Sequence, residues 1–292
     1  MCSIVRNNGP TAVKSPVEEM LRYIDSLPDD PPKAKVEIRT RKFWAAVWSE
    51  FLATLLLIVV TSPSTGEVDV RQSLAVGASA ALLTYTLQGA AFNPAVSIPR
   101  CLVGRSSLLK LFASVLAQAF GAVLGSLLVF ALQSEGNQPL IETKLHLSQV
   151  FAVEFLGSFV VVLTVLTSDD DVESGLMKFQ AFPVGLAYGA ATLFSFSHTG
   201  VGLNPVRALG QVLVARNWTN HWVYWIGPLL GGLIGGFTYD YARSSRKDVQ
   251  EQAERTSRQR ELDRERGLRR GLSALSQDTE MTNSLNTNDC RV

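Results

Sequence analysis

The residues of this sequence best suited to contact a small molecule are two asparagines, each followed by proline inside an apolar stretch. They are Asn93, before Pro94, and Asn204, before Pro205. An asparagine side chain presents N–H donors that bind water or another small polar molecule with no covalent step. The pattern therefore indicates hydrogen bonding to a passing molecule, and no enzyme activity is expected.

Each asparagine–proline pair also has the form of a helix start. Asn is a good N-cap, and Pro fits the first helical position, where its missing N–H has no consequence. The apolar stretches that follow, residues 95–103 and 206–215, are about half of the roughly 20 residues that a membrane-spanning helix needs. Half-helices begin at membrane depth only inside protein or beside a watery cavity. Taken alone, each Asn is more simply a cap, but two such starts predict a cavity. The expected starts are Pro94, Ala95, Pro205 and Val206.

Three of the charged residues within the apolar part of the chain stand out by their place. Arg207 is on the first turn of the second half-helix, and a charge so near the membrane interior is a candidate functional residue. Glu50 and Glu154 lie inside expected spans. We interpret the two glutamates as structural polar groups rather than as transport residues.

Composition places the chain among membrane proteins. Its 292 residues are 47% hydrophobic, with a mean hydropathy of +0.15 and a net charge of +1. The basic residues are offset by acidic neighbours, so no nucleic-acid partner is expected. The three cysteines are Cys2, Cys101 and Cys290, whose spacing predicts neither a disulfide framework nor a metal site. No cofactor is expected, and membrane lipid is the expected surrounding.

The sequence repeats itself over two halves. Glu50-Phe-Leu-Ala-Thr54 matches Glu154-Phe-Leu-Gly-Ser158, and Gly121 with Gly125 matches Gly231 with Gly235. The glycine pairs are small-xxx-small patterns, which are typical of closely packed helices in lipid. The expected spans are about residues 43–61, 74–88, 108–133, 148–167, 179–196 and 221–243.

Three spans in each half determine how the halves are arranged. Because three is odd, the second half enters from the opposite side of the membrane, which gives inverted repeats. Cations at 33–42 favour a cytoplasmic N-terminus, and an even number of spans returns the C-terminus to the same side. The predicted segments are 1–42, a cytoplasmic segment with a short amphipathic helix; 43–243, the membrane domain, with repeats about 43–133 and 148–243; and 244–292, a cytoplasmic, largely disordered tail.

These motifs resemble those of the aquaporin family, also called the major intrinsic proteins. The resemblance is carried by the glutamate starts, the two Asn-Pro pairs, the run Thr199-Gly-Val-Gly-Leu-Asn-Pro-Val-Arg207 and the run His221-Trp-Val-Tyr-Trp-Ile-Gly-Pro228. It implies an all-α membrane fold of six transmembrane helices and two re-entrant half-helices in inverted repeats. It also implies a homotetramer at the plasma membrane, with residues 43–243 as an aquaporin-like channel domain. The segment before the first span is similar to the branch of big-brain-like and brain water-channel proteins.

The resemblance also locates a selectivity constriction. Its positions fall on Val76, Thr192, Val201 and Arg207. Water-selective members usually have Phe and His where this chain has Val76 and Thr192, so the constriction is expected to be wider and more apolar. In the first half-helix, Pro99 is expected to kink or end the helix. Arg100 either faces the cytoplasmic mouth of the pore or, as we favour, extends its charged head to the membrane interface.

The function predicted on these grounds is passive transport of water, with small uncharged solutes such as glycerol or urea. Two alternatives stay open. One is a big-brain-like, ion-conducting channel. The other is a junctional or signalling membrane protein that does not transport and uses its tails to bind partners.

Overall fold

A computed structural model describes residues 34–62, 70–87, 89–132, 145–173, 180–199 and 203–288. The amphipathic helix predicted before residue 34 lies outside these ranges. The chain divides into two compact units, residues 1–237 and 238–292.

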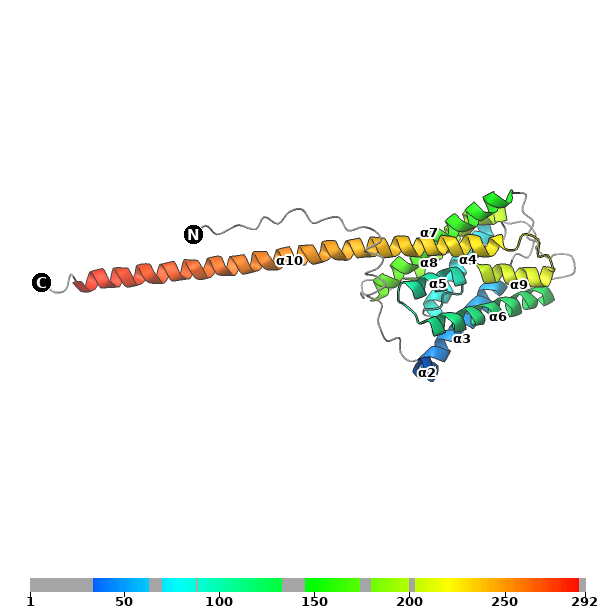
Figure 1. The fold of residues 1–292 in the computed structure, drawn as a ribbon, viewed down its shortest axis with the longest axis horizontal. Coiled ribbons are helices and arrows are strands. Elements are labelled where there is room, and N and C mark those ends of the chain that lie inside the picture. Colours follow the sequence, from blue (N-terminus) through cyan, green and yellow to red (C-terminus); the bar gives the residue numbers. More distant parts are fainter. Residues whose placement is uncertain are drawn as a thin grey trace, which may run out of the picture. The chain divides into compact units, whose positions relative to one another are not determined.

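Helices make up the first unit (Figure 1), and their order follows the predicted spans and half-helices. In the described part of the chain, three helices are long and apolar enough to cross a membrane: residues 41–60, 108–132 and 147–170. The helices are α2 (Ala34–Glu37), α3 (Arg41–Val60), α4 (Val70–Thr86), α5 (Pro94–Leu102), α6 (Leu108–Leu132), α7 (Leu147–Glu173), α8 (Ala181–Thr199), α9 (Pro205–Ala215) and α10 (Val223–Asn288).

The glycines of the repeat mark the same close contact in both halves. In the first half, Gly125 of α6 lies against α3, and a Cβ there would be 3.0 Å from the Leu55 carbonyl oxygen. In the second half, Gly235 of α10 lies against α7, and its Cβ would be 2.9 Å from the Phe159 carbonyl oxygen. Small residues are needed at both places because the helix backbones touch.

Helices α4 and α8 pack closely on each other. A Cβ on Gly77 of α4 would lie 2.8 Å from the Gly185 carbonyl oxygen of α8. Their buried faces also carry hydroxyl groups, including those of Thr84 and Thr192. Such polar inward faces lower the hydropathy of a span without exposing the polar groups to lipid.

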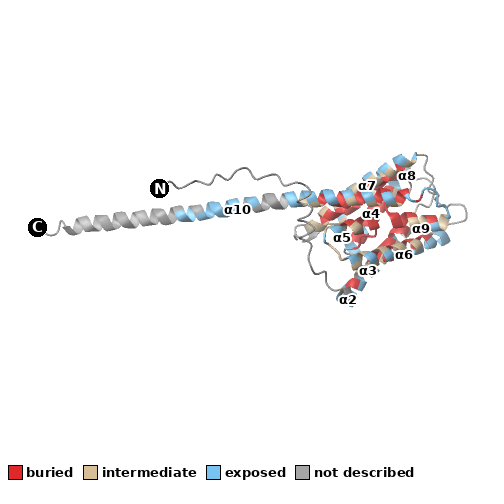
Figure 2. Cartoon of the chain, in the orientation of Figure 1, coloured by how far each residue is buried: buried red, intermediate tan, exposed pale blue. Residues whose placement is uncertain are grey.

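The two half-helices are the most enclosed elements of the first unit. Figure 2 shows mainly buried residues on α5 and α9. Pro99 does not end α5, which continues to Leu102. The ring of Pro99 packs on α10, because a Cβ on Gly236 would be 2.9 Å from Pro99 Cβ. Close packing thus holds α5 together beyond the proline.

In the second unit, α10 extends to Asn288. The physical reason is composition: residues 246–266 are rich in Arg, Glu and Gln, which are strong helix formers. Glu254 also precedes Arg258 by four residues, a spacing that favours a helical ion pair. The side chains of residues 254–262 are exposed.

Candidate functional site

Both asparagines cap the half-helices that they begin. Asn93 has an extended backbone, and its Oδ1 accepts a hydrogen bond from the Ala95 N–H at 2.9 Å. Asn204 does the same for α9, where its Oδ1 accepts from the Val206 N–H at 3.2 Å. Pro94 and Pro205 occupy the first helical positions. Each cap leaves the side-chain NH₂ group of its asparagine available for other acceptors.

The NH₂ groups of the two asparagines tie the half-helices together. Asn93 Nδ2 donates to the Leu203 carbonyl oxygen at 3.0 Å, and Asn204 Nδ2 donates to the Phe92 carbonyl oxygen at 2.7 Å. Each acceptor is the residue directly before the opposite asparagine. The helix N-termini therefore meet at one place, where their partial positive charges add.

The residues before the asparagines have an unusual backbone conformation. Phe92 has φ 42° and Leu203 has φ 64°, in the left-handed region that bulky residues avoid. This conformation turns the Phe92 and Leu203 carbonyls toward the opposite half-helix. The residue types do not predict this left-handed conformation, since such positions are usually occupied by Gly or Asn.

The buried glutamates hold these strained loops. Glu50 accepts from the Ala91 and Phe92 N–H groups, both at 2.8 Å, and from Gln118 Nε2 at 2.9 Å. Glu154 accepts from the Leu203 N–H at 3.0 Å and from the Thr199 hydroxyl. The oxygen atoms of both carboxylates thus have fixed donors from the loops that precede the half-helices. A scaffold role needs such contacts, and that role stays a prediction for both glutamates.

Arg207 is buried, and its guanidinium reaches the C-terminal end of α3. It donates to the Thr61 hydroxyl and to the Thr61 carbonyl oxygen, both at 2.9 Å. Val76 of α4 and Thr192 of α8 are also buried. Val201 lies outside the described residues. Thr61 was missed by the sequence reasoning, because its contact with Arg207 joins two distant parts of the chain.

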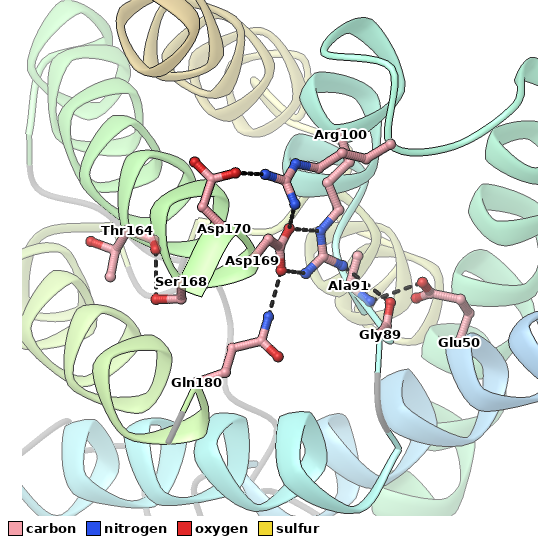
Figure 3. A network of polar contacts seen from close by, with 10 residues as sticks. Glu50, Gly89, Ala91, Arg100, Thr164, Ser168, Asp169, Asp170 and Gln180 are labelled. Carbon is pink, nitrogen blue, oxygen red and sulfur yellow. Dashed lines mark hydrogen bonds and ion pairs between the residues drawn. The ribbon is translucent and has the colours of Figure 1, made fainter. Parts of the chain in front are cut away.

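Arg100 belongs to a cluster of polar contacts around Asp169 (Figure 3). Its Nε and Nη2 donate to the two Asp169 carboxylate oxygens at 2.9 and 2.8 Å, and its Nη1 donates to the Gly89 carbonyl oxygen at 3.1 Å. Gln180 also donates to Asp169, and Arg105 pairs with Asp170. The favoured extension of Arg100 to the membrane interface stays a prediction, and the structure adds to it a carboxylate partner, Asp169.

The titratable groups of the described residues form no cluster of three or more His, Cys, Asp or Glu that could hold a metal ion. The charged groups near the half-helices have partners of their own chain instead. The site is thus an arrangement of hydrogen-bond donors at the meeting point of two helix N-termini.

A family model described as Major intrinsic protein matches residues 37–239. The chain belongs to the major intrinsic protein family. Lens fiber major intrinsic protein from Rattus norvegicus is 33% identical over 219 residues, which cover 70% of this chain and 83% of the relative. Neurogenic protein big brain from Drosophila melanogaster is 33% identical over 230 residues, which cover 73% of this chain and 32% of that protein.

A solved structure supports the same fold. The X-ray structure of the aquaglyceroporin from Plasmodium falciparum matches with a TM-score of 0.61 at 22% identity, covering 71% of this chain and 99% of that one. This major intrinsic protein is therefore a multi-pass membrane channel with an aquaporin-like fold. The predicted fold class, six spans and two half-helices in inverted repeats, is confirmed.

One further residue at the centre of this major intrinsic protein was not predicted. The Tyr188 hydroxyl of α8 lies 3.3 Å from Asn93 Nδ2. A signal for it exists in the sequence, since Tyr188 stands one helical turn before Thr192 and so shares its face of α8.

Proposed function

We propose that this protein passes water across the plasma membrane, together with small uncharged solutes such as glycerol or urea. The observation that carries the proposal is the pair of asparagine side chains at the meeting N-termini of α5 and α9. One N–H of the Asn204 amide donates to the Phe92 carbonyl oxygen, and the second can donate to a molecule at the centre of the pore.

Water suits such a site because it both donates and accepts hydrogen bonds. Its oxygen accepts from the central N–H donors, and its hydrogens turn toward acceptors on either side. A cation meets the partial positive charges of two helix N-termini, so its passage is disfavoured. Arg207 adds a full positive charge near the constriction formed with Val76, Thr192 and Val201.

The proposed arrangement in the membrane follows the inverted repeats. Both termini are cytoplasmic, and the channel assembles as a homotetramer. An epitope at either end should be labelled only after the plasma membrane is permeabilised. Labelling of either epitope in intact cells contradicts this orientation.

Transport is tested with the purified protein in proteoliposomes. Stopped-flow light scattering gives the permeabilities to water, glycerol and urea, and the matched variant is Asn204→Asp. Aspartate caps a helix as well as asparagine does but has no N–H to donate. We expect water flux above that of empty liposomes for the wild type, and a large loss for Asn204→Asp.

The second candidate function is conduction of ions by a big-brain-like channel, and the similarity to the big brain protein favours it. Voltage-dependent current without water flux in the same membranes would favour that function. If the protein is inserted but carries neither water nor current, a junctional or signalling role without transport is the better account.

A further inference from the structure

The two central asparagines are not equivalent. Asn93 Nδ2 has two hydrogen-bond acceptors, the Leu203 carbonyl oxygen at 3.0 Å and the Tyr188 hydroxyl at 3.3 Å. A side-chain amide has two N–H donors, so both donors of Asn93 are used. Asn204 Nδ2 donates to the Phe92 carbonyl oxygen at 2.7 Å and has no second acceptor among the residues that the structure describes.

Tyr188 is fixed in place from two sides. Its side chain is buried, and its ring packs on Phe92 with the ring centroids 5.4 Å apart. Phe92 in turn carries the carbonyl that binds Asn204 and the N–H that binds Glu50. The phenol is therefore positioned by the same loop that builds the centre of the site.

The buried face of α8 places Tyr188 in one row with other hydroxyl groups. Tyr188, Thr192 and Ser195 follow at helical spacing, and all three are buried. Within the described part of the chain, Thr192 Oγ1 and Ser195 Oγ have no hydrogen-bond partner. Buried hydroxyl groups in this situation need a polar partner, so this row is the face of α8 that a path for water would follow.

We propose that Tyr188 restricts the centre of the pore by capping Asn93, an inference that rests on the proposed function of water transport. Its hydroxyl takes the position of a water molecule against the second Asn93 N–H. A water molecule at the centre then meets one amide N–H, from Asn204, and a phenol. The tyrosine ring occupies space that a solute larger than water would need.

Two variants of Tyr188 separate the effect of the hydroxyl from that of the ring. Tyr188→Phe removes the cap and releases one Asn93 N–H, with almost no change of volume. We expect it to raise water permeability in proteoliposomes by about two- to tenfold, the factor that corresponds to one released hydrogen bond, and to leave urea permeability unchanged. Tyr188→Val also removes the ring, and should raise water permeability further and admit urea.

The matched control is Tyr85→Phe, which removes the hydroxyl of an exposed tyrosine on α4. It should have the permeability of the wild type. Size-exclusion profiles and melting temperatures in detergent show whether each variant is folded. If Tyr188→Val does not fold, the nearly isosteric Tyr188→Phe still decides the question.

A folded Tyr188→Phe channel with wild-type water permeability overturns the proposal, while water transport itself stands. Wild type, Tyr188→Phe and Tyr188→Val that all fail to conduct water overturn both the proposal and the proposed function. A rise in water flux for Tyr188→Phe but not for Tyr85→Phe supports the cap.

Discussion

The two buried glutamates should respond differently to the same substitution. Glu50 accepts three N–H donors, from the backbone of Ala91 and Phe92 and from Gln118. Glu50→Gln replaces one acceptor oxygen by an NH₂ group, which then faces a buried N–H. If Gln118 reverses its amide to compensate, the Ser97 hydroxyl 2.9 Å away must donate to it, and so gives up its own 3.2 Å bond to the Asn93 carbonyl oxygen. With one charge-assisted bond lost and the others weakened, the expected loss of unfolding free energy is about 2–4 kcal/mol.

Glu154→Gln is the matched comparison in the second repeat. Glu154 accepts from the Leu203 N–H and from the Thr199 hydroxyl. A hydroxyl group both donates and accepts, so Thr199 can accept from the new NH₂ group and donate to the Ser195 carbonyl oxygen, 3.2 Å away. No buried donor is left without an acceptor, and the expected loss is about 1 kcal/mol.

Reversible unfolding in mixed detergent micelles, followed by circular dichroism, gives both free energies. We expect Glu50→Gln to be the more destabilising substitution by at least about 1 kcal/mol, and to lose more water flux. Equal losses for the two variants, or a larger loss for Glu154→Gln, would refute the reasoning from donor count. Such a result would mean that the charge itself, rather than the number of fixed donors, determines stability.

Three further predictions concern the constriction and the Asp169 cluster. Val76→Phe combined with Thr192→His should narrow the constriction, so that urea or glycerol flux falls more than water flux in proteoliposomes; equal losses would count against the placement of these residues. Asp169→Asn should destabilise the protein by about 1–3 kcal/mol in micelle unfolding, because the partly buried guanidinium of Arg100 loses its counter-charge; an unchanged free energy contradicts this. Water flux should resist external mercurials, and Val201→Cys should create a block that added thiol reverses; an accessible but insensitive Val201→Cys channel would refute the position assigned to Val201.

The fold was predictable because its main signals are local. Asn93 and Asn204, each before proline, specify a helix start through the cap and through the fixed φ of proline. Glycines at corresponding places of the two halves specify close helix contacts without knowledge of the partner helix. The repeat then supplies the topology, because an odd number of spans inverts the second half.

Other parts of the site depend on long-range contacts that residue types do not reveal. Asp169 was not singled out in the sequence, yet it is the partner of Arg100 across 69 residues of chain. The extended position favoured for Arg100 was reasonable for an unpaired cation. An aspartate near the end of α7 supplies the carboxylate partner of this partly buried guanidinium, and a pairing over that sequence distance cannot be read from residue types.

The strained loops show why neither half of the channel can form its centre alone. The Phe92 conformation is stabilised from its own half by Glu50, but its carbonyl oxygen is bound by Asn204 of the other half. Leu203 has the reciprocal arrangement with Glu154 and Asn93. A left-handed backbone at a bulky residue is retained only where surrounding contacts over-determine it. Besides the role proposed for them as donors at the pore centre, the two asparagines are therefore the link by which each repeat fixes the loop of the other.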